Sequence, residues 1–177
     1  MPFRKITPSE FSENPFTIID KDWMLVASAD DSGDKCGKDY NMMTASWGGV
    51  GILWHKPVAF VFIRPQRHTF SFTERNERMT LSFFDENYRS ALAFCGRKSG
   101  RDFDKAAECS LTPAFDENAN GRVVWFEEAR LVIITRKLYA QPLEERFALS
   151  ETVTENYPEN DYHMMYVAEI EEILVRE

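Results

Sequence analysis

Residues 41–69 read N-M-M-T-A-S-W-G-G-V-G-I-L-W-H-K-P-V-A-F-V-F-I-R-P-Q-R-H-T, and this stretch decides the expected fold. The apolar run 58–63 predicts a buried strand. Before it, residues 44–46 supply hydroxyls and small side chains, and the glycines in 48–51 predict a turn. After it, residues 64–69 bring cations and a hydroxyl to the end of the strand. Two polar clusters therefore bracket one buried strand.

Both polar clusters suit the same anion. Hydroxyls and the backbone N–H groups of a glycine turn can bind phosphate oxygens. An arginine adds a charge-assisted hydrogen bond that is often bidentate. A flat apolar group joined to that phosphate would find packing partners among the interleaved aromatic residues, which are Trp47, Trp54, Phe60, Phe62 and Phe70. We therefore expect a nucleotide-like cofactor.

Outward from this stretch, β character dominates. Residues 1–15 contain Pro2, Pro8 and Pro15 and are interpreted as an N-terminal arm. Further strands are predicted at 16–20, 23–29, 78–84, 123–126, 129–140 and 162–175, with a third strand entering the hydroxyl cluster after a turn at 30–38. Short helices are predicted at 67–76, 87–98 and 102–109, with Ser99 or Asp102 as an N-cap, and a helical turn at 144–149.

This order of elements predicts a mainly β fold, a closed or nearly closed barrel. A parallel α/β fold needs a crossover helix between most strand pairs, whereas the last third of this chain is nearly all β. Neither G-x-G-x-x-G nor G-x-x-x-x-G-K-[ST] occurs, so neither a dinucleotide fold nor a P-loop is supported. The 177 residues are expected to form a single domain, 1–177, with its own core.

Charge and composition narrow the class of partner. A net charge of −8 argues against a nucleic-acid surface, because phosphate backbones need clustered cations. Six cations nevertheless fall in two short segments, and a solvated basic face is the alternative interpretation: they are Arg64, Arg67, Arg97, Lys98, Arg101 and Lys105. No signal peptide or membrane span is visible, so a soluble protein without a membrane partner is expected.

Cysteine and histidine usage completes this picture. Three cysteines without C-x-x-C spacing favour neither a disulfide framework nor a zinc site, and they fit a reducing cytoplasm. His55, His68 and His163 are not spaced as metal ligands. No metal is expected.

Five ordered blocks resemble a known family. They are N-x-M-T-A-S-W-G-G at 41–49, W-x-K-P at 54–57, R-P-x-R-x-T at 64–69, L-S-F-F at 81–84 and G-R-K-S-G-R-D-x-D-K at 96–105. Together they resemble the flavin reductase-like family of FMN-binding split β-barrels, of the flavoredoxin type, over roughly residues 14–175. The resemblance implies a split β-barrel and a homodimer that holds FMN near the subunit interface.

The resemblance also implies a set of cofactor-binding residues. They are Asn41, Met43, Thr44, Ala45, Ser46, Trp47, Arg64, Arg67, Thr69, Ser82, Phe83, Phe84, Gly96, Ser99, Gly100 and Lys105. Arg67 and Thr69 are the foremost phosphate ligands, with Lys105 as a further cation. Arg64 could instead pair with an acidic neighbour, and the two phenylalanines could be plain core. His163 is an additional candidate near the flavin, with a structural role as the alternative.

A flavin supplies the hydride and electron chemistry, so no catalytic triad is expected. The resemblance implies an oxidoreductase like NAD(P)H:flavin reductases and flavoredoxins, with NADH or NADPH as co-substrate. Its electron acceptor would be another protein or free flavin. One alternative is an FMN-binding electron carrier or redox sensor without nicotinamide activity. Another is a split-barrel pyridoxamine phosphate oxidase or haem-handling relative, against which the 96–105 block argues.

Overall fold

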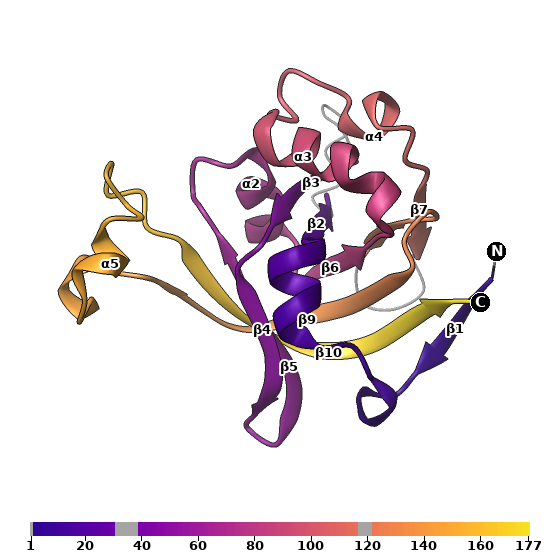
Figure 1. Cartoon of the computed structure of the whole chain (residues 1–177), viewed down its shortest axis with the longest axis horizontal. Coiled ribbons are helices and arrows are strands. Elements are labelled where there is room, and N and C mark those ends of the chain that lie inside the picture. The colour runs from indigo at the N-terminus through magenta and orange to yellow at the C-terminus, as the bar shows by residue number, and fades with distance from the viewer. Residues whose placement is uncertain (1, 31–38, 117–121) are drawn as a thin grey trace.

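A computed structural model describes residues 2–30, 39–116 and 122–177 (Figure 1). Its strands are β1 Phe3–Ile6, β2 Met24–Ala29, β3 Tyr40–Ala45, β4 Gly48–Leu53, β5 Lys56–Ile63, β6 Arg78–Phe83, β7 Pro113–Asp116, β8 Val123–Phe126, β9 Leu131–Pro142 and β10 Met164–Arg176. Its helices are α1 Pro15–Thr17, α2 His68–Arg75, α3 Arg89–Arg97, α4 Lys105–Glu108 and α5 Glu151–Thr154, with short helical turns η1 Pro8–Glu10, η2 Ile18–Asp22, η3 Glu86–Tyr88 and η4 Glu145–Phe147.

The main sheet closes on itself through its two outermost strands. The strand order is β3-β2-β6-β9-β10-β5-β4, with β1 added on β10 and antiparallel pairing throughout. The outermost strands β3 and β4 are consecutive in the chain, with Ser46 and Trp47 between them, so the sheet must curl until its two edges meet. At that junction a Cβ on Gly48 would lie 2.7 Å from the Phe60 carbonyl oxygen and 2.9 Å from Met24 Cε. The expected mainly β, nearly closed barrel is confirmed.

Buried side chains form two cores, one on each face of the curled sheet. Along β2, Met24 and Val26 belong to one cluster, whereas Leu25 and Ala27 belong to the other. This is the period of two that a strand imposes. Trp23 packs against the second cluster, on the same face as Leu25 and Ala27. The second cluster is covered by α3 and the β7–β8 hairpin, which leaves both faces of β2 buried.

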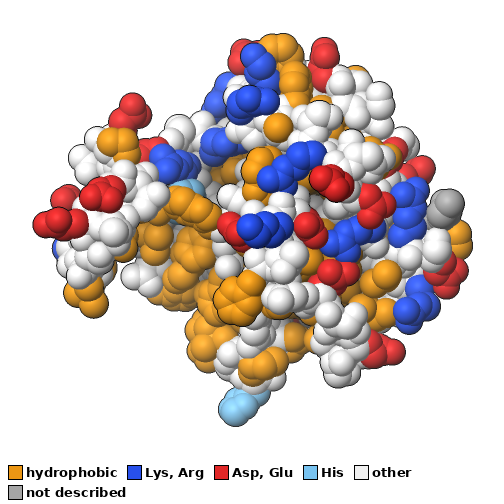
Figure 2. All heavy atoms as spheres, in the orientation of Figure 1, with side chains coloured by type: hydrophobic (Ala, Val, Ile, Leu, Met, Phe, Trp, Pro, Cys, Tyr) orange, Lys and Arg blue, Asp and Glu red, His pale blue; other side chains and the backbone are white. Residues whose placement is uncertain are grey.

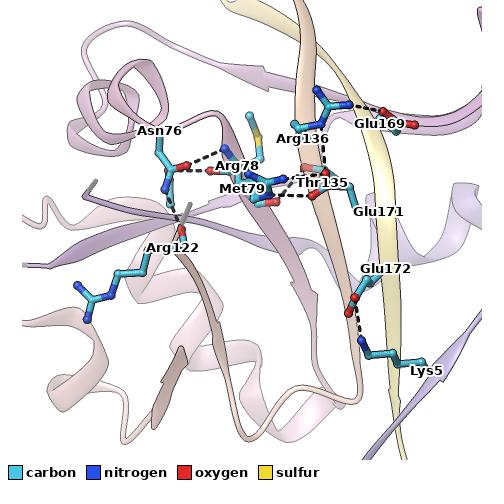
Figure 3. A network of polar contacts seen from close by, with 11 residues as sticks. Lys5, Asn76, Arg78, Met79, Arg122, Thr135, Arg136, Glu169, Glu171 and Glu172 are labelled. Carbon is cyan, nitrogen blue, oxygen red and sulfur yellow. Dashed lines mark hydrogen bonds and ion pairs between the residues drawn. The ribbon is translucent and has the colours of Figure 1, made fainter. Parts of the chain in front are cut away.

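A ladder of ion pairs joins four strands on the side of the sheet drawn in Figure 3. Arg78 on β6 donates to both carboxylate oxygens of Glu171 on β10, at 2.8 and 2.9 Å. Arg136 on β9 reaches the same carboxylate at 3.1 Å and Glu169 at 2.8 Å. Lys56 on β5 completes the ladder on Glu169, and these cations lower the pKa of the Glu169 carboxyl. The network fixes the register of β10 beside its bulge between Ile170 and Glu172.

Several predicted elements are confirmed and others are wrong. The strands predicted at 58–63 and 78–84 correspond to β5 and β6, and the helices at 67–76 and 87–98 to α2 and α3. The predicted strand at 16–20 is wrong: Asn14 accepts the Phe16 N–H at 3.0 Å and Pro15 occupies the first helical position, so helical turns form instead. Much of the turn predicted at 30–38 falls outside the described residues.

Two further predictions need correction. The glycine turn at 48–51 is wrong because these residues lie in β4, and the chain turns at Trp54 and His55. The predicted N-cap of the helix at 102–109 is also wrong, since Asp104 accepts the Ala107 N–H at 3.2 Å. Within the expected N-terminal arm, residues Phe3–Ile6 pair with β10, so part of this arm belongs to the sheet.

Residues 143–163 connect β9 to β10 and project from the body of the molecule, at the left of Figure 1. We call this segment the 143–163 arm; it carries α5. Three apolar side chains on it face solvent: Leu149 is 99% exposed, Phe147 61% and Val153 41%. Among the described residues, no helix has the length and apolar character that a membrane crossing needs.

Candidate functional site

A cavity of about 210 Å³ lies between the beginning of α2 and the loop that joins α3 to α4. We call it the basic cavity. The residues that line it are Gln66, Arg67, His68, Thr69, Gly96, Arg97, Lys98, Ser99, Gly100, Arg101 and Lys105. Five of these residues are Lys or Arg and none is Asp or Glu. Figure 2 shows Lys and Arg side chains gathered at the top of the molecule, over this region. Such a donor set, beside the N–H groups that begin α2, suits an anion.

Three residues that are far apart in the sequence meet at the end of α3. Arg67 Nη2 donates to the Cys95 carbonyl at 3.3 Å, and Lys105 Nζ donates to the same oxygen at 3.5 Å and also to the Met42 carbonyl. Thr44 Oγ1 donates to the Leu92 carbonyl at 2.6 Å. The Cys95 carbonyl is one of the last four of α3, which have no partner within the helix and favour cations. Thr44, bonded one turn earlier on α3, lies against Gly96 in the last turn. The fold therefore brings together the β3, α2 and α4 residues that the sequence blocks singled out.

The wall behind the basic cavity is built around Asn41. Its Nδ2 donates to Thr69 Oγ1 at 3.0 Å, and both side chains are buried. A Cβ on Gly100 would lie 2.1 Å from Asn41 Oδ1, so only glycine permits this approach. A Cβ on Gly96 would lie 3.4 Å from Thr44 Cβ, which is a tight contact. Asn41 thus fixes α2 and the α3–α4 loop to β3 from behind.

The electrostatics of Arg67 favour an incoming anion. Burial lowers the pKa of its guanidinium, and the neighbouring charge of Arg64 lowers it further. A negative group that binds next to a partly desolvated cation with a like charge beside it stabilises the charged form of that cation. A phosphate group fits this cavity by charge and by donor chemistry.

A second cavity, of about 460 Å³, begins where β3 ends. We call it the apolar cavity. The residues that line it are Pro15, Phe16, Ile19, Asp20, Ser46, Trp47, Gly48, Gly49 and Val50. The six-residue strand β3 carries Asn41 behind the basic cavity, and Ser46 and Trp47, which directly follow the strand, line the apolar cavity. Trp47 is 45% exposed and offers a flat face. One strand therefore links an anion site to a hydrophobic, aromatic surface.

His163 lies beside this surface in a buried position. Its ring centroid is 5.2 Å from that of Trp47, and its Nδ1 pairs with the Tyr157 hydroxyl at 2.9 Å. Burial, followed by the nearby charge of Arg64, lowers the pKa of His163 to about 4. The imidazole is therefore neutral at neutral pH.

The model of the family described as "Flavin reductase like domain" matches residues 20–177. The chain belongs to this family. No curated protein matches the sequence significantly.

Solved structures show the same flavin reductase-like split-barrel fold. The flavoredoxin of Desulfovibrio vulgaris (Miyazaki F) superposes with a TM-score of 0.64 at 21% identity, covering 88% of this chain and 69% of that one. An FMN-binding domain of a flavin reductases-like enzyme from Shewanella baltica OS155 gives 0.66 at 12% identity, covering 98% and 77%. Component B of nitrilotriacetate monooxygenase from Bacillus cereus gives 0.66 at 16% identity, covering 100% and 83%. At these identities the likeness concerns the fold.

In this flavin reductase-like chain, several expected site residues lie away from both cavities. Arg64 pairs with Asp161 and donates to the Asn156 carbonyl at 2.9 Å, which is the acidic-neighbour alternative. Met43 and Phe83 are buried in one core, and Phe84 is buried in the other. Ala45 packs against the first core. Burial of the two phenylalanines agrees with the core alternative, and their contact with a cofactor stays a prediction.

Ser82 differs from the other expected site residues. It lies on β6 opposite Leu25 and Val132, has no exposed surface, and its Oγ has no hydrogen-bond partner among the described residues. Those two neighbours belong to the second core, so the Ser82 side chain points into that core. Ser99, by contrast, lines the basic cavity and accepts the Arg101 N–H at 3.2 Å.

Five residues that line the basic cavity were not in the expected cofactor-binding set: Gln66, His68, Arg97, Lys98 and Arg101. Gln66 and His68 flank Arg67 at the beginning of α2, so the helix start predicted at residue 67 was the signal that could have found them. The other three were noted only as part of the group of cations. Among the described residues, no cluster of three or more His, Cys, Asp or Glu side chains could hold a metal ion.

Proposed function

We propose that this flavin reductase-like protein binds FMN and transfers hydride or electrons through it, with NADH or NADPH as the reductant. The observation that carries the proposal is the meeting of Thr44, Arg67 and Lys105 at the end of α3, beside a cavity lined by cations and no carboxylate. Bound flavin would supply the redox chemistry, and the protein would bind and orient it.

In this proposal the basic cavity would bind the phosphate of FMN and the apolar cavity its ring system. Arg67, the N–H groups that begin α2 and the glycine-containing loop after α3 would hold the phosphate. The ring system would lie along β3 toward Trp47 and Phe16, whose apolar surfaces limit the access of water. His163, neutral and hydrogen-bonded to Tyr157, would add a polar but uncharged wall beside the ring.

Purified protein titrated with FMN and then with NADH or NADPH tests this proposal. We expect a yellow protein whose flavin absorbance is bleached by a reduced nicotinamide in the absence of oxygen. A colourless protein that ignores added FMN would rule the proposal out. An FMN complex reduced by dithionite or a partner protein, but by neither nicotinamide, would favour the alternative of an electron carrier or redox sensor.

We also propose that the protein is a cytoplasmic homodimer whose electrons pass to free flavin or to an acceptor protein. Large exposed apolar side chains at the apolar cavity, on the β4–β5 hairpin and on the 143–163 arm support a second copy as the partner. Phe16 is 86% exposed, Ile52 73% and Leu149 99%. Figure 2 shows orange surface lining the hollow between the 143–163 arm and the β4–β5 hairpin. Extended apolar patches of this kind mark interaction sites.

A further inference from the structure

Two cysteine thiols lie in contact beneath the basic cavity. Cys95 is in the last turn of α3, Cys109 directly follows α4, and their sulfur atoms are 3.9 Å apart. Both are free thiols; Cys95 is buried and Cys109 is partly exposed. A disulfide needs a separation of about 2.05 Å, so a closing movement of roughly 2 Å, shared by two side chains, would join them.

The chain between these cysteines forms much of the basic cavity. The two positions are 14 apart in the sequence, and the intervening residues include Gly96, Ser99, Gly100 and Lys105, all of which line the cavity. The Cys95 carbonyl also accepts hydrogen bonds from Arg67 and Lys105. A bond between the sulfur atoms would therefore tie the base of the loop that surrounds the anion site.

We propose that Cys95 and Cys109 are a modification site, at which a two-electron oxidant such as hydrogen peroxide forms a reversible disulfide that holds the loop of the basic cavity in place. A cross-link reduces the conformational freedom of the loop it closes. A loop that is already ordered binds its ligand more tightly, because less freedom is lost on binding. The expected consequence for FMN rests on the proposed function; the cross-link itself does not.

The two thiols have different parts in the oxidation. Cys109 Sγ donates to the Ala91 carbonyl at 3.7 Å, which leaves Cys95 as the donor in the contact between the sulfur atoms. The more exposed Cys109 sulfur attacks the peroxide, giving a sulfenic acid and one water. The Cys95 sulfur then displaces the hydroxyl, forming the disulfide and a second water. Burial raises the pKa of Cys95 to about 12 and also raises that of Cys109, so the reaction should be slow and should speed up with pH.

Peptide mapping after peroxide treatment tests the cross-link in a Cys36→Ser background, which leaves these two cysteines. Trypsin cuts after Arg97, Lys98, Arg101 and Lys105, so the two cysteines leave on separate peptides unless a disulfide joins them. We expect one joined peptide pair that dithiothreitol separates, whereas methionine oxidation would not reverse. The matched Cys109→Ser variant should give separate peptides under the same treatment.

Two further readouts decide whether the cross-link acts on the loop. The melting temperature should rise by about 5 °C on oxidation and return on reduction, and the Kd for FMN should fall several-fold. Separate peptides after oxidation, a joined pair with an unchanged melting temperature, or an FMN Kd that stays constant or rises would overturn the proposal. A reduced protein that binds no FMN would count against the proposed function, and the peptide map and melting temperature would still decide the cross-link.

Discussion

At the scale of single residues, Gly100 shows how narrowly the basic cavity is built. A methyl group there would lie 2.1 Å from Asn41 Oδ1, and Asn41 in turn holds Thr69. Gly100→Ala should lower the free energy of unfolding by about 1–3 kcal/mol, the range for overpacking a filled site, and should weaken FMN binding. Chemical denaturation and FMN titration measure the two effects.

The matched control is Gly51→Ala, because a Cβ at that exposed glycine meets no atom within 4 Å. It should leave FMN binding unchanged. Equal effects of the two substitutions on FMN affinity would show that the contact between Gly100 and Asn41 does not shape the site.

His163 should make stability depend on pH. Burial and the charge of Arg64 disfavour the imidazolium, so they lower the pKa of His163 from its ordinary value of 6.5 to about 4 in the folded protein. The unfolded chain therefore binds a proton at higher pH than the folded one does, so this contribution is complete above pH 6.5 and is lost as the pH falls toward 4.

His163→Gln removes this titration. Between pH 6.5 and 4 the variant should lose about 2–3 kcal/mol less unfolding free energy than the unmodified protein does. Denaturation curves at several pH values compare the two proteins. Parallel pH profiles of the variant and the unmodified protein would contradict the assignment.

At this scale the sequence predicted the cavity residues better than the core residues. The blocks around Thr44, Arg67 and Gly100 were found because hydroxyls, cations and glycines in an acidic chain are distinctive. Residue type does not reveal that Arg64 has a distant ion-pair partner or that the Ser82 side chain points into the second core. Asp161, which pairs with Arg64, lies 97 positions away.

At the scale of elements, the β4–β5 hairpin shows where local signals misled. Glycines normally mark turns, yet Gly48 is glycine because β4 passes close to β2 and β5 at the barrel junction. The actual turn uses Trp54 and His55, with φ of 52° and 60°. The backbone there is strained, because residues with a Cβ disfavour positive φ and two-residue hairpins of this type favour Asn-Gly. The strands β2, β3, β5, β6, β8, β9 and β10 correspond to predicted segments, whereas β1, β4 and β7 were not predicted as strands.

His55→Gly should relieve part of this strain and raise the free energy of unfolding by about 0.5–1 kcal/mol, once the greater freedom of glycine in the unfolded chain is subtracted. Urea denaturation measures the change. Ile52→Gly in the same hairpin is the control: its φ is not positive and its side chain is 73% exposed, so glycine should destabilise there. A loss of stability in both variants would show that the turn is not strained.

At the scale of the whole molecule, the sheet curls until its two outermost strands meet, and several large apolar side chains remain exposed. The order of strands in the sheet was not predictable from the sequence, because pairing between segments as distant as β1 and β10 leaves no local pattern. The exposure of the apolar side chains on the 143–163 arm was likewise not predictable from the sequence. Phe147, Leu149 and Val153 are exposed together on this arm, and a group of exposed apolar side chains is typical of an interaction surface.

Leu149→Asp should shift the protein from dimer to monomer while leaving the stability of each subunit nearly unchanged, because the side chain makes little contact within its own chain. Analytical ultracentrifugation over a range of concentrations measures the shift. Thr152→Asp adds the same charge at another exposed position of the arm and should remain dimeric. A Leu149→Asp protein that dimerises as before would remove this surface from the proposed interface.

The central claim is that Arg67 and its neighbours hold the phosphate of a flavin mononucleotide. The most direct measurement compares the Kd values of FMN and riboflavin, which lacks the phosphate, for the unmodified protein, Arg67→Ala and the exposed control Arg4→Ala. We expect Arg67→Ala to weaken FMN binding by about 1.5–3 kcal/mol and to leave riboflavin binding unchanged, with Arg4→Ala altering neither. Equal affinities of the unmodified protein for the two flavins, or unchanged FMN affinity in Arg67→Ala, would contradict the claim.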